Sequence, residues 1–388
     1  MRGFTSAGTL PSLFAFPFFA LQSILLAPVS ARPPRHSLYA SSDNPDPQIL
    51  TGLYGTATTG AQIVIHDTSG KPSWTWSFQE GKNISADLQK CLYDVCKGSG
   101  CGAPENKWAH RGDSVLAIHG YAAVIINHHP GQDSDKAVTF GICLNRDDMD
   151  NSHTVELVGD GKLAVATTTD EMTGSIKIFD IHNTKGPLDP PIQQLDGIPA
   201  THALVWDAHN SVLWAAGNDR SPIQDGSTSI LNAYTHQQDG SFDTTPETQT
   251  ITTAARLTTE WGSDTPWWDG PHAMAPVPQQ RKLLITTDMD VHVYDMDAKT
   301  FEHGAPVAQD YMPGFQPVGA RTGPDGVDLP RSDIKSVSYS ESGQLLYVQA
   351  EWNETYGDTV NFITNGQKGT NIWNQMLYRS RWFTRPAW

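Results

Sequence analysis

The sequence predicts an all-β fold assembled from small repeated sheets, and three observations predict it. Short apolar runs of strand length recur along the chain, with polar turns between them. Glycine and proline are frequent, with 33 and 26 copies in 388 residues, while charged residues make up only 18%. No stretch carries the long apolar stripe with a period of about 3.6 residues that an extended helix needs. One short helix is expected, near residues 86–93.

The first residues have the features of a targeting segment. Arg2 precedes a largely apolar stretch from Leu13 to Leu26, and Val29-Ser30-Ala31 offers the small residues that signal peptidase accepts. The apolar stretch is short and contains Pro17, so a membrane anchor is the weaker interpretation. We therefore expect a signal peptide and a secreted, extracellular protein.

The rest of the chain divides into a lead-in and one domain. The signal peptide is expected to cover residues 1–31. Residues 32–47 are rich in Pro, Ser and Asp, which predicts a disordered lead-in. Residues 48–388 contain the repeated runs and are expected to form a single domain.

Net charge limits the classes of partner. The formal charge is −16, which argues against nucleic acid, whose phosphates attract Lys and Arg. It also disfavours anionic membranes, and no later segment is long enough to span a bilayer. We expect a monomer whose partner is a small molecule or a glycan.

Cysteines and glycosylation sequons agree with a secretory route. Four cysteines are an even number, which in a secreted chain predicts disulfides. Three of them lie close together in the sequence, so at least one tight local bridge is expected, and three connectivities are open. Zinc binding is the weaker alternative, because the spacing is not C-x-x-C. The cysteines are Cys91, Cys96, Cys101 and Cys143, and the sequons begin at Asn83 and Asn353.

One structural unit recurs along the chain. Its clearest copy begins at His153, where two strand-like runs flank the turn Asp160-Gly161 and a third run covers residues 175–180. Further copies begin at His202, His272 and Lys335. Two weaker copies cover residues 48–67 and 114–143, and polar insertions lie near residues 79–110, 237–268 and 303–332.

Six such units predict a six-bladed β-propeller. Several starts are spaced as propeller blades are, at ~40–50 residues. A small sheet cannot bury both faces alone, whereas a ring of sheets buries them and leaves only short edges. Seven blades are an alternative count, and a β-sandwich or an irregular double barrel is the alternative architecture.

Several motifs resemble those of a known family. They are Trp74-Thr-Trp76, Asn151-Ser-His153-Thr-Val-Glu156, Thr201-His202-Ala-Leu-Val-Trp-Asp207, Asp269-Gly-Pro-His272-Ala-Met274 and Met376-Leu-Tyr-Arg-Ser-Arg-Trp382. In order and spacing they resemble an uncharacterised family of secreted bacterial and fungal six-bladed propellers, a domain of unknown function. The resemblance covers residues 48–383 and implies a fold and secretion, but no reaction. The arrangement is similar to arylsulfotransferase and quinoprotein propellers only at the level of fold.

The sequence departs from that family at one position. The family carries an aspartate after the third histidine, and Ala273 stands there in this chain. This departure puts in doubt any role that needs a carboxylate beside His272. Trp74 and Trp76 are expected to pack between blades.

Three histidines form the sharpest functional signal. His153, His202 and His272 stand at the head of three consecutive blades. Equivalent positions of inner strands form a ring around the axis of a propeller, so we expect the three imidazoles to meet at one mouth of the channel. Neutral imidazoles that converge can bind a divalent metal, although the cofactor remains unknown. They can also act as metal-free acids or bases, or each can hydrogen-bond a neighbouring blade and bind nothing.

Other residues give weaker signals. Glu156 has the opposite strand parity to His153, which predicts that the two side chains leave the strand on different sides. Trp267 and Trp268 can stack on a sugar ring beside His272, or plug the space between blades. Asp269 belongs to the same candidate ligand site and shapes the turn into His272. Two further segments are interpreted structurally: Asp288-Met-Asp290 as a solvated acidic turn, and Arg379, Arg381, Arg385 and Trp382 as a closing strand with exposed basic residues.

These observations leave three functions open. The first is an enzyme with lyase or hydrolase chemistry, metal-assisted or not, that acts on a glycan or small molecule at the channel mouth. The second is a propeller that binds a glycan or a protein without turnover. The third is a tailoring enzyme for a secreted secondary metabolite. No G-x-S-x-G, H-E-x-x-H, P-loop or dinucleotide fingerprint occurs in the chain.

Overall fold

The structure is a computed structural model. It describes residues 47–56, 60–95, 102–144, 149–168, 174–257, 267–317, 332–350 and 355–385. They belong to one compact unit, Pro45–Trp388. The predicted signal peptide and nearly all of the predicted lead-in lie outside the described residues and stay predictions.

Strands dominate the fold, as the sequence predicts. Four separate sheets each contain four antiparallel strands in chain order, so each strand pairs with the next. The first sheet is β4 (Glu105–Ala109), β5 (Ser114–His119), β6 (Ala122–Asn127) and β7 (Val138–Cys143). The second is β8 (Ser152–Val158), β9 (Lys162–Thr167), β10 (Ile176–Asp180) and β11 (Gln193–Leu195). The third is β12 (Ala200–Asp207), β13 (Val212–Asn218), β14 (Ser229–Thr235) and β15 (Glu247–Thr252), and the fourth is β16 (Pro271–Pro276), β17 (Lys282–Thr287), β18 (Val291–Asp295) and β19 (Thr300–His303).

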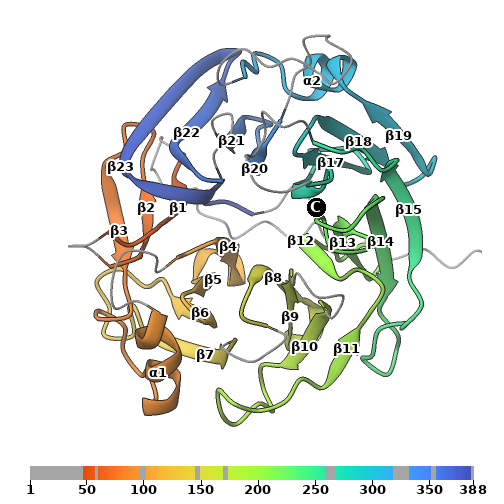
Figure 1. Cartoon of the computed structure of the whole chain (residues 1–388). Coiled ribbons are helices and arrows are strands. Elements are labelled where there is room, and N and C mark those ends of the chain that lie inside the picture. The colour runs from red at the N-terminus through yellow and green to blue at the C-terminus, as the bar shows by residue number, and fades with distance from the viewer. Residues whose placement is uncertain are drawn as a thin grey trace, which may run out of the picture. The chain divides into compact units, whose positions relative to one another are not determined.

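The sheets are arranged around a common centre. In Figure 1 the first strands β4, β8 and β12 lie nearest the centre, while β7, β11 and β15 lie at the rim. Neighbouring first strands contact one another around the ring, β8 with β12, β12 with β16 and β16 with β20 (Ile334–Tyr339). This arrangement of small antiparallel sheets around an axis is a β-propeller.

A fifth, larger sheet joins the two ends of the domain. Its seven strands run in the order β20 (Ile334–Tyr339), β21 (Leu345–Gln349), β22 (Gly357–Thr364), β23 (Gln367–Trp382), β1 (Ile49–Leu53), β2 (Gln62–His66) and β3 (Pro72–Trp76). The long strand β23 changes partner near Leu377. Up to and including that residue it pairs with β22, and from it onward it pairs with β1. The second half of β23, the last strand of the chain, therefore pairs with β1, the first strand, on the side nearer the centre of the ring.

The apolar core lies between neighbouring sheets. Trp76 is fully buried and Trp74 nearly so, and both pack with residues of β5 and β6 across the sheet interface. The prediction that these two tryptophans pack between blades is confirmed. Such aromatic rings bury large apolar areas and thereby stabilise the contact between sheets.

Helix α1 (Ala86–Val95) confirms the expected short helix and is tied to the outer strand β7. A Cβ atom at Gly141 of β7 would lie 2.4 Å from Leu88, so glycine permits the close contact. A disulfide joins Cys91 of α1 to Cys143, the last residue of β7. Cys91 therefore bridges across 52 residues rather than locally, while Cys96 and Cys101 lie outside the described residues.

The predicted polar insertions contain more structure than the sequence indicated. The segment 79–110 holds α1 and also the inner strand β4, which the apolar pattern missed. The segment 237–268 contains the outer strand β15, and the segment 303–332 contains helix α2 (Ala305–Tyr311). The outer strand β15 has a polar exposed face and β4 carries charges, so neither stands out as an apolar run.

Two further findings bear on the environment of the protein. Among the described residues, no helix has the length and apolar character needed to cross a bilayer. Asn83 of the first sequon is exposed and adopts a left-handed backbone conformation, with φ of 60°. Asn353 of the second sequon lies outside the described residues.

Candidate functional site

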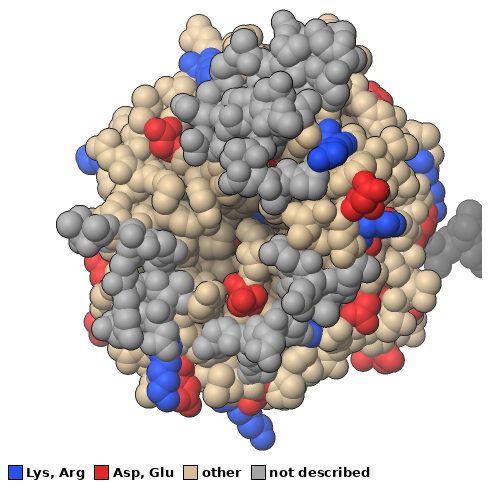
Figure 2. Space-filling model, viewed as in Figure 1, with Lys and Arg blue, Asp and Glu red and all other residues tan. Residues whose placement is uncertain are grey.

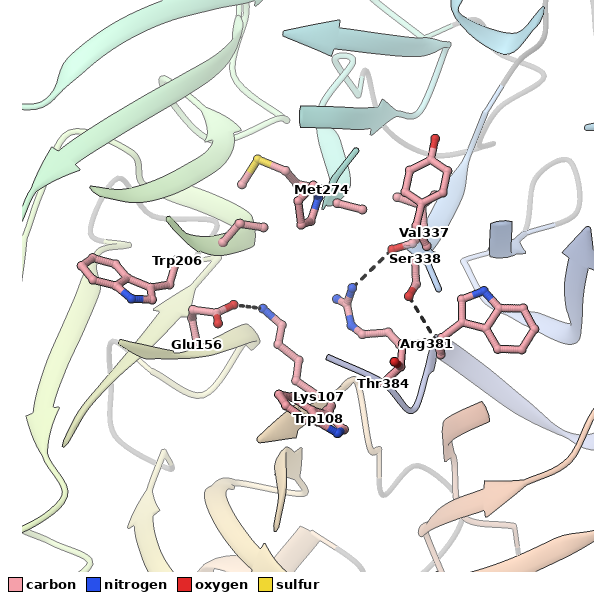
Figure 3. A pocket seen from close by; sticks show the side chains of 14 residues that line it. Lys107, Trp108, Glu156, Trp206, Met274, Val337, Ser338, Arg381 and Thr384 are labelled. Atoms are coloured by element: carbon pink, nitrogen blue, oxygen red, sulfur yellow. Dashed lines mark hydrogen bonds and ion pairs between the residues drawn. The ribbon is translucent and has the colours of Figure 1, made fainter. Parts of the chain in front are cut away.

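The central channel is the space enclosed by β4, β8, β12, β16, β20 and the second half of β23, and its two ends differ. Figure 2 shows one face of the ring hollowed at its centre. The predicted histidines lie at the first residues of β8, β12 and β16. A defined cavity of about 100 Å³ lies instead at the later residues of the same strands (Figure 3), roughly 10 Å away at about 3.3 Å of rise per residue.

The same irregularity occurs near the start of four inner strands. In each, the pairing with the next strand shifts by one residue, which leaves a bulge. The residues left without a partner are His153, His202, His272 and Lys335. A bulge redirects the side chain of its extra residue, so the same β-bulge, repeated in four strands, sets the direction of these four side chains.

The structure brings the three predicted histidines together. The ring centroids of His153 and His202 lie 4.9 Å apart, and those of His202 and His272 lie 5.1 Å apart. Tyr378 of β23 completes the group, with its ring 5.7 Å from His153 and 6.5 Å from His272. Sequence reasoning missed Tyr378, although it lies within the tail motif.

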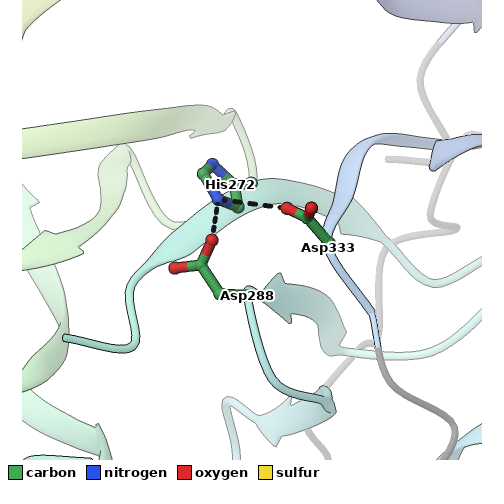
Figure 4. A group of neighbouring side chains, drawn as sticks. All are labelled: His272, Asp288 and Asp333. Carbon is green, nitrogen blue, oxygen red and sulfur yellow. Dashed lines mark hydrogen bonds and ion pairs between the residues drawn. The ribbon is translucent and has the colours of Figure 1, made fainter. Parts of the chain in front are cut away.

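The imidazole nitrogens do not converge on one point. The Nδ1 atom of His153 lies 2.8 Å from the hydroxyl of Thr168, which occupies that nitrogen. In the part of the chain that the structure describes, the one set of three metal-ligand atoms within 4.8 Å of one another comes from His272, Asp288 and Asp333 (Figure 4). The three-histidine metal site therefore stays a prediction, and the geometry offers a different set of ligands.

A lysine lies among those three ligands. The Nζ atom of Lys335 is 3.0 Å from Nε2 of His272 and 3.9 Å from Asp288, and it pairs closely with Asp333. Burial alone would lower the pKa of Lys335, but the charges of Asp333 and Asp288 outweigh it and raise that pKa. The ammonium is therefore a resident cation among these ligands. The sequence contained one signal for a role of Lys335: it begins the fourth copy of the repeat, at the position where three other copies have histidine.

His272 connects a carboxylate to a phenol. Its Nε2 atom lies 2.6 Å from Oδ1 of Asp288, and its Nδ1 atom lies 3.3 Å from the hydroxyl of Tyr378. Although burial opposes it, the contact with His272 and the positive charge of Lys335 lower the pKa of Asp288. In the tautomer that fits the contacts with Asp288 and Tyr378, Nε2–H donates to Asp288 and Nδ1 accepts from Tyr378. The Lys335 ammonium, 3.0 Å from the same Nε2, then donates to Asp333 and not to the ring. The result is a hydrogen-bonded chain in the order Tyr378, His272, Asp288.

Asp288 comes from a turn that the sequence interpreted as solvated. The β17–β18 turn places it beside His272, so the carboxylate thought missing at Ala273 is supplied from another part of the chain. Buried Asp269 supports this turn by accepting a hydrogen bond from the amide of Met289. Burial and the nearby charge of Asp288 raise the pKa of Asp269 to about 7.

The other two imidazoles are held neutral. Burial lowers the pKa of His153 to about 3, and the positive charge of Arg379 adds to the effect. Burial likewise lowers the pKa of His202 well below its usual range. Both side chains keep some solvent contact, and Nδ1 of His202 has no hydrogen-bond partner among the described residues. Near neutral pH, both rings are uncharged groups that can exchange hydrogen bonds with a ligand.

A buried ion pair holds the backbone of two of the histidines. Arg379 is fully buried rather than exposed, which corrects the prediction for the closing strand. Its guanidinium donates to the backbone carbonyls of His202 and His272 and to the carboxylate of Glu105. Burial would raise the pKa of Glu105, but Arg379, Arg381 and Lys107 outweigh it and hold that pKa at about 2. The bulges are thus fixed by a charge network.

The predicted aromatic site is less closely connected to the histidines. Trp267 is 40% exposed, so its ring can meet a ligand, while Trp268 is partly buried. Trp268 pairs with Arg256 in an isolated bridge and donates its amide to Pro222. Among the described contacts of these two tryptophans, none reaches the imidazoles. Asp269 is the one member of the predicted set joined to the cluster, through Met289 and Asp288.

Comparisons with known proteins give a fold-level likeness without a family. No family model matches the chain, and no curated protein matches it. A crystal structure of the mitotic checkpoint complex contains a similar chain, with 10% identity, 94% of this chain and 92% of that chain covered, and a TM-score of 0.43. TolB from Acinetobacter baumannii is similar with 12% identity, 87% and 67% covered, and a TM-score of 0.48. At these values neither supports an argument, and the fold rests on the order of the sheets.

Proposed function

We propose that the protein is an enzyme that transfers protons at the histidine end of the channel, with Tyr378 as the group that meets the substrate. The observation that carries this proposal is the hydrogen-bonded chain of Tyr378, His272 and Asp288. A reactive hydroxyl, an imidazole beside it and a carboxylate that orients the imidazole form a recurrent arrangement for moving protons. Tyr378 exchanges a proton with the substrate, and His272 exchanges it with Tyr378.

The neighbouring groups suit this chemistry. His153 is a neutral imidazole beside Tyr378, and His202 is a neutral imidazole beside His153. Both can donate hydrogen bonds to substrate oxygens where negative charge develops. The charges of Lys335 and Arg379 reach the Tyr378 hydroxyl and partly offset the increase in its pKa that burial causes. The first effect stabilises negative charge on the substrate, and the second makes loss of the phenolic proton less costly than burial alone would.

Elimination fits the cluster better than hydrolysis. Hydrolysis of a glycosidic bond uses two carboxyl groups on either side of the bond. Here Asp288 and Asp333 both engage the cation Lys335, and no second pair of carboxylates lines the described part of the cluster. In this elimination, deprotonated Tyr378 takes a C–H proton, the neighbouring C–O bond breaks as a C=C bond forms, and Tyr378 returns the proton to the leaving oxygen. The C–H must be made acidic by an adjacent carboxyl or carbonyl group, and uronic acids supply one in glycans. The substrate class proposed is therefore a glycan that contains uronic acid.

The test measures double-bond formation. The full chain is incubated with a panel of uronic acid polysaccharides, and short-wavelength ultraviolet absorbance reports the unsaturated ends that elimination creates. We expect activity on at least one polymer and a loss of about 10²–10⁴-fold for Tyr378→Phe. Tyr347→Phe is the matched control, because among the described residues the Tyr347 hydroxyl bonds only the carbonyl of Gln316.

Two outcomes would overturn the proposal. Retained activity in Tyr378→Phe would show that the phenol is not the reacting group. Tight binding of a glycan without turnover, lost in Trp267→Ala but kept in Tyr378→Phe, would favour the binding propeller instead. The exposed ring of Trp267 makes that alternative concrete.

We also propose six blades. The seven-stranded sheet can be divided into two blades that share β23, one ending with its first half and the other beginning with its second half. Together with the four separate sheets, this makes six. The shared strand would close the ring and leave no sheet edge open between the two chain ends. An experimental density map of the domain counts the blades directly.

Secretion and glycosylation remain part of the proposal. We propose cleavage after Ala31 and a glycan on Asn83, whose exposed side chain can accept one. Expression of the complete sequence in a eukaryotic host, followed by N-terminal sequencing and glycosidase treatment of the medium, tests both. Retention of the protein in the cell with an intact N-terminus would contradict the proposal.

A further inference from the structure

The second end of the channel contains a cavity that the proposed reaction does not use. Its volume is about 100 Å³, whereas one water molecule needs roughly 10–15 Å³ on a comparable measure, so it has room for a small planar ring. Apolar and aromatic side chains form much of its wall (Figure 3). They include Trp108, Trp206, Met274, Tyr339 and Trp382.

Two cations with unused hydrogens line the same cavity. The ammonium of Lys107 donates to Glu156 at 2.6 Å and to the carbonyl of Leu204 at 2.9 Å. Its third N–H has no acceptor within hydrogen-bond distance among the described residues, since the carboxylate of Glu105 is 3.9 Å away. The guanidinium of Arg381 holds Glu105 through Nε and Nη2. Its Nη1 group makes one long contact, 3.4 Å to the carbonyl of Val337, so at least one further N–H remains.

Glu156 lines the cavity because of the β-bulge. The parity prediction had placed His153 and Glu156 on different sides of their strand. The extra residue at His153 changes that relation, so His153 joins the imidazoles while Glu156 reaches Lys107 at the other end of the channel. Because of this bulge, β8 contributes His153 to the histidine end of the channel and Glu156 to the cavity end.

The charges around the cavity do not cancel. The connected cluster contains three basic and two acidic side chains: Lys107, Arg379 and Arg381, with Glu105 and Glu156. All five side chains are at most 18% exposed. An uncompensated charge in a poorly solvated site is costly, so the surplus of one positive charge favours an anion in the cavity. The walls favour an apolar or ring-shaped body attached to that anion.

We propose that this cavity is a second binding site, for small molecules that carry one carboxylate on a planar ring. The carboxylate accepts hydrogen bonds from Lys107 and Arg381 and supplies the missing negative charge. The ring packs between the aromatic walls. The site is separate from Tyr378 and does not depend on the proposed reaction.

Binding of simple probes tests the site on the full chain. Calorimetric titration with benzoate should show binding, and benzamide, which has the same shape without charge, should bind about tenfold more weakly or worse. Lys107→Met should weaken benzoate binding by about tenfold, whereas Glu156→Gln should strengthen it because the competing carboxylate is gone. Met274→Trp should abolish binding by filling the cavity without changing any charge.

The opposite signs of the two charge variants make the result decisive. Weaker binding in Glu156→Gln, or equal binding of benzoate and benzamide, would overturn the proposal. Unaltered binding in Met274→Trp would show that benzoate binds elsewhere and would overturn it as well. Tyr378→Phe, at the other end, should leave benzoate binding unchanged, so failure of the proposed reaction leaves this test intact.

Discussion

Lys335 and His272 occupy the same bulge position in neighbouring inner strands, and Nζ of one lies 3.0 Å from Nε2 of the other. The fourth repeat thus places a cation where the three preceding repeats place an imidazole. Asp333, which pairs with Lys335, has a left-handed backbone with φ of 41°, an unusual conformation for a residue other than glycine. The unusual backbone conformation therefore accompanies the ion pair with Lys335. Lys335 and Asp333 form one structural unit rather than two independent site residues.

The first prediction concerns metal binding. Replacement of Lys335 by methionine removes the ammonium from among His272, Asp288 and Asp333, and leaves donor atoms of the types that bind divalent metals. We expect Lys335→Met to retain about one Zn²⁺ or Mn²⁺ per chain after dialysis, and the wild type to retain none. Elemental analysis of both proteins measures this.

The control for that prediction is Lys299→Met, which removes an exposed lysine from an ion pair with Glu247. It should behave as the wild type does. Stoichiometric metal in the wild-type protein would contradict the prediction and would restore the metal-assisted mechanism.

The second prediction concerns the three histidines themselves. If they serve the reaction, alanine at His153, His202 or His272 should leave thermal unfolding nearly unchanged. Activity should fall, by about 10²–10⁴-fold for His272, which acts directly on Tyr378. If they only hydrogen-bond neighbouring blades, the same substitutions should lower the unfolding temperature instead. His209→Ala, on an exposed turn, is the control.

The third prediction concerns acid stability. The pKa of Glu105 is about 2 in the folded protein against its ordinary value of 4.5, so its charged form is favoured by folding. This contribution, about 3 kcal/mol, is fully present above pH 4.5 and is lost as the pH falls toward 2. Urea unfolding followed by tryptophan fluorescence at several pH values measures it.

Glu105→Gln isolates this effect. The variant should be less stable by about 3–5 kcal/mol near neutral pH, because it leaves Arg379 buried without its partner. It should also lack the steep loss of stability below pH 4.5. Glu80→Gln, whose carboxylate is 46% exposed, should change neither property. If the free energy of unfolding fell equally steeply below pH 4.5 in the wild type and in Glu105→Gln, Glu105 would not be the source of the acid sensitivity.

The fourth prediction concerns the disulfide. The bond between Cys91 and Cys143 closes a loop of 52 residues and holds α1 on the outer strand β7. Replacement of both cysteines by alanine should reduce the free energy of unfolding by about 2–4 kcal/mol. Proteolysis should then begin within or beside α1. An unchanged unfolding midpoint in denaturant for the double variant would contradict this prediction.

Local patterns predicted most of the strands but not the ones that carry charge. Apolar runs marked strands such as β9 and β17, because their side chains are buried on both faces. The inner strand β4 was missed, because Glu105 and Lys107 face the channel and resemble a polar loop in sequence. A pattern based on hydrophobicity cannot distinguish a charged channel wall from a solvated turn, since both are polar.

The candidate site divides in a similar way. The sequence located His153, His202 and His272, because each heads a repeat and a repeat fixes position along a strand. It did not locate Tyr378 or Asp288, because one comes from the chain end that closes the ring and the other from a turn. No spacing in the sequence relates residues that meet only through that closure.

By itself, the sequence determined the strand content, the repeated unit and the alignment of the blade-leading histidines, since all three follow from local spacing. The tertiary structure alone decided what those histidines touch. Closure by β23 brought Tyr378 and Arg379 to them, and the bulges aimed each side chain toward the axis. The physical reason is that strand formation depends on neighbours along the chain, whereas the channel is built from single residues that separate blades contribute.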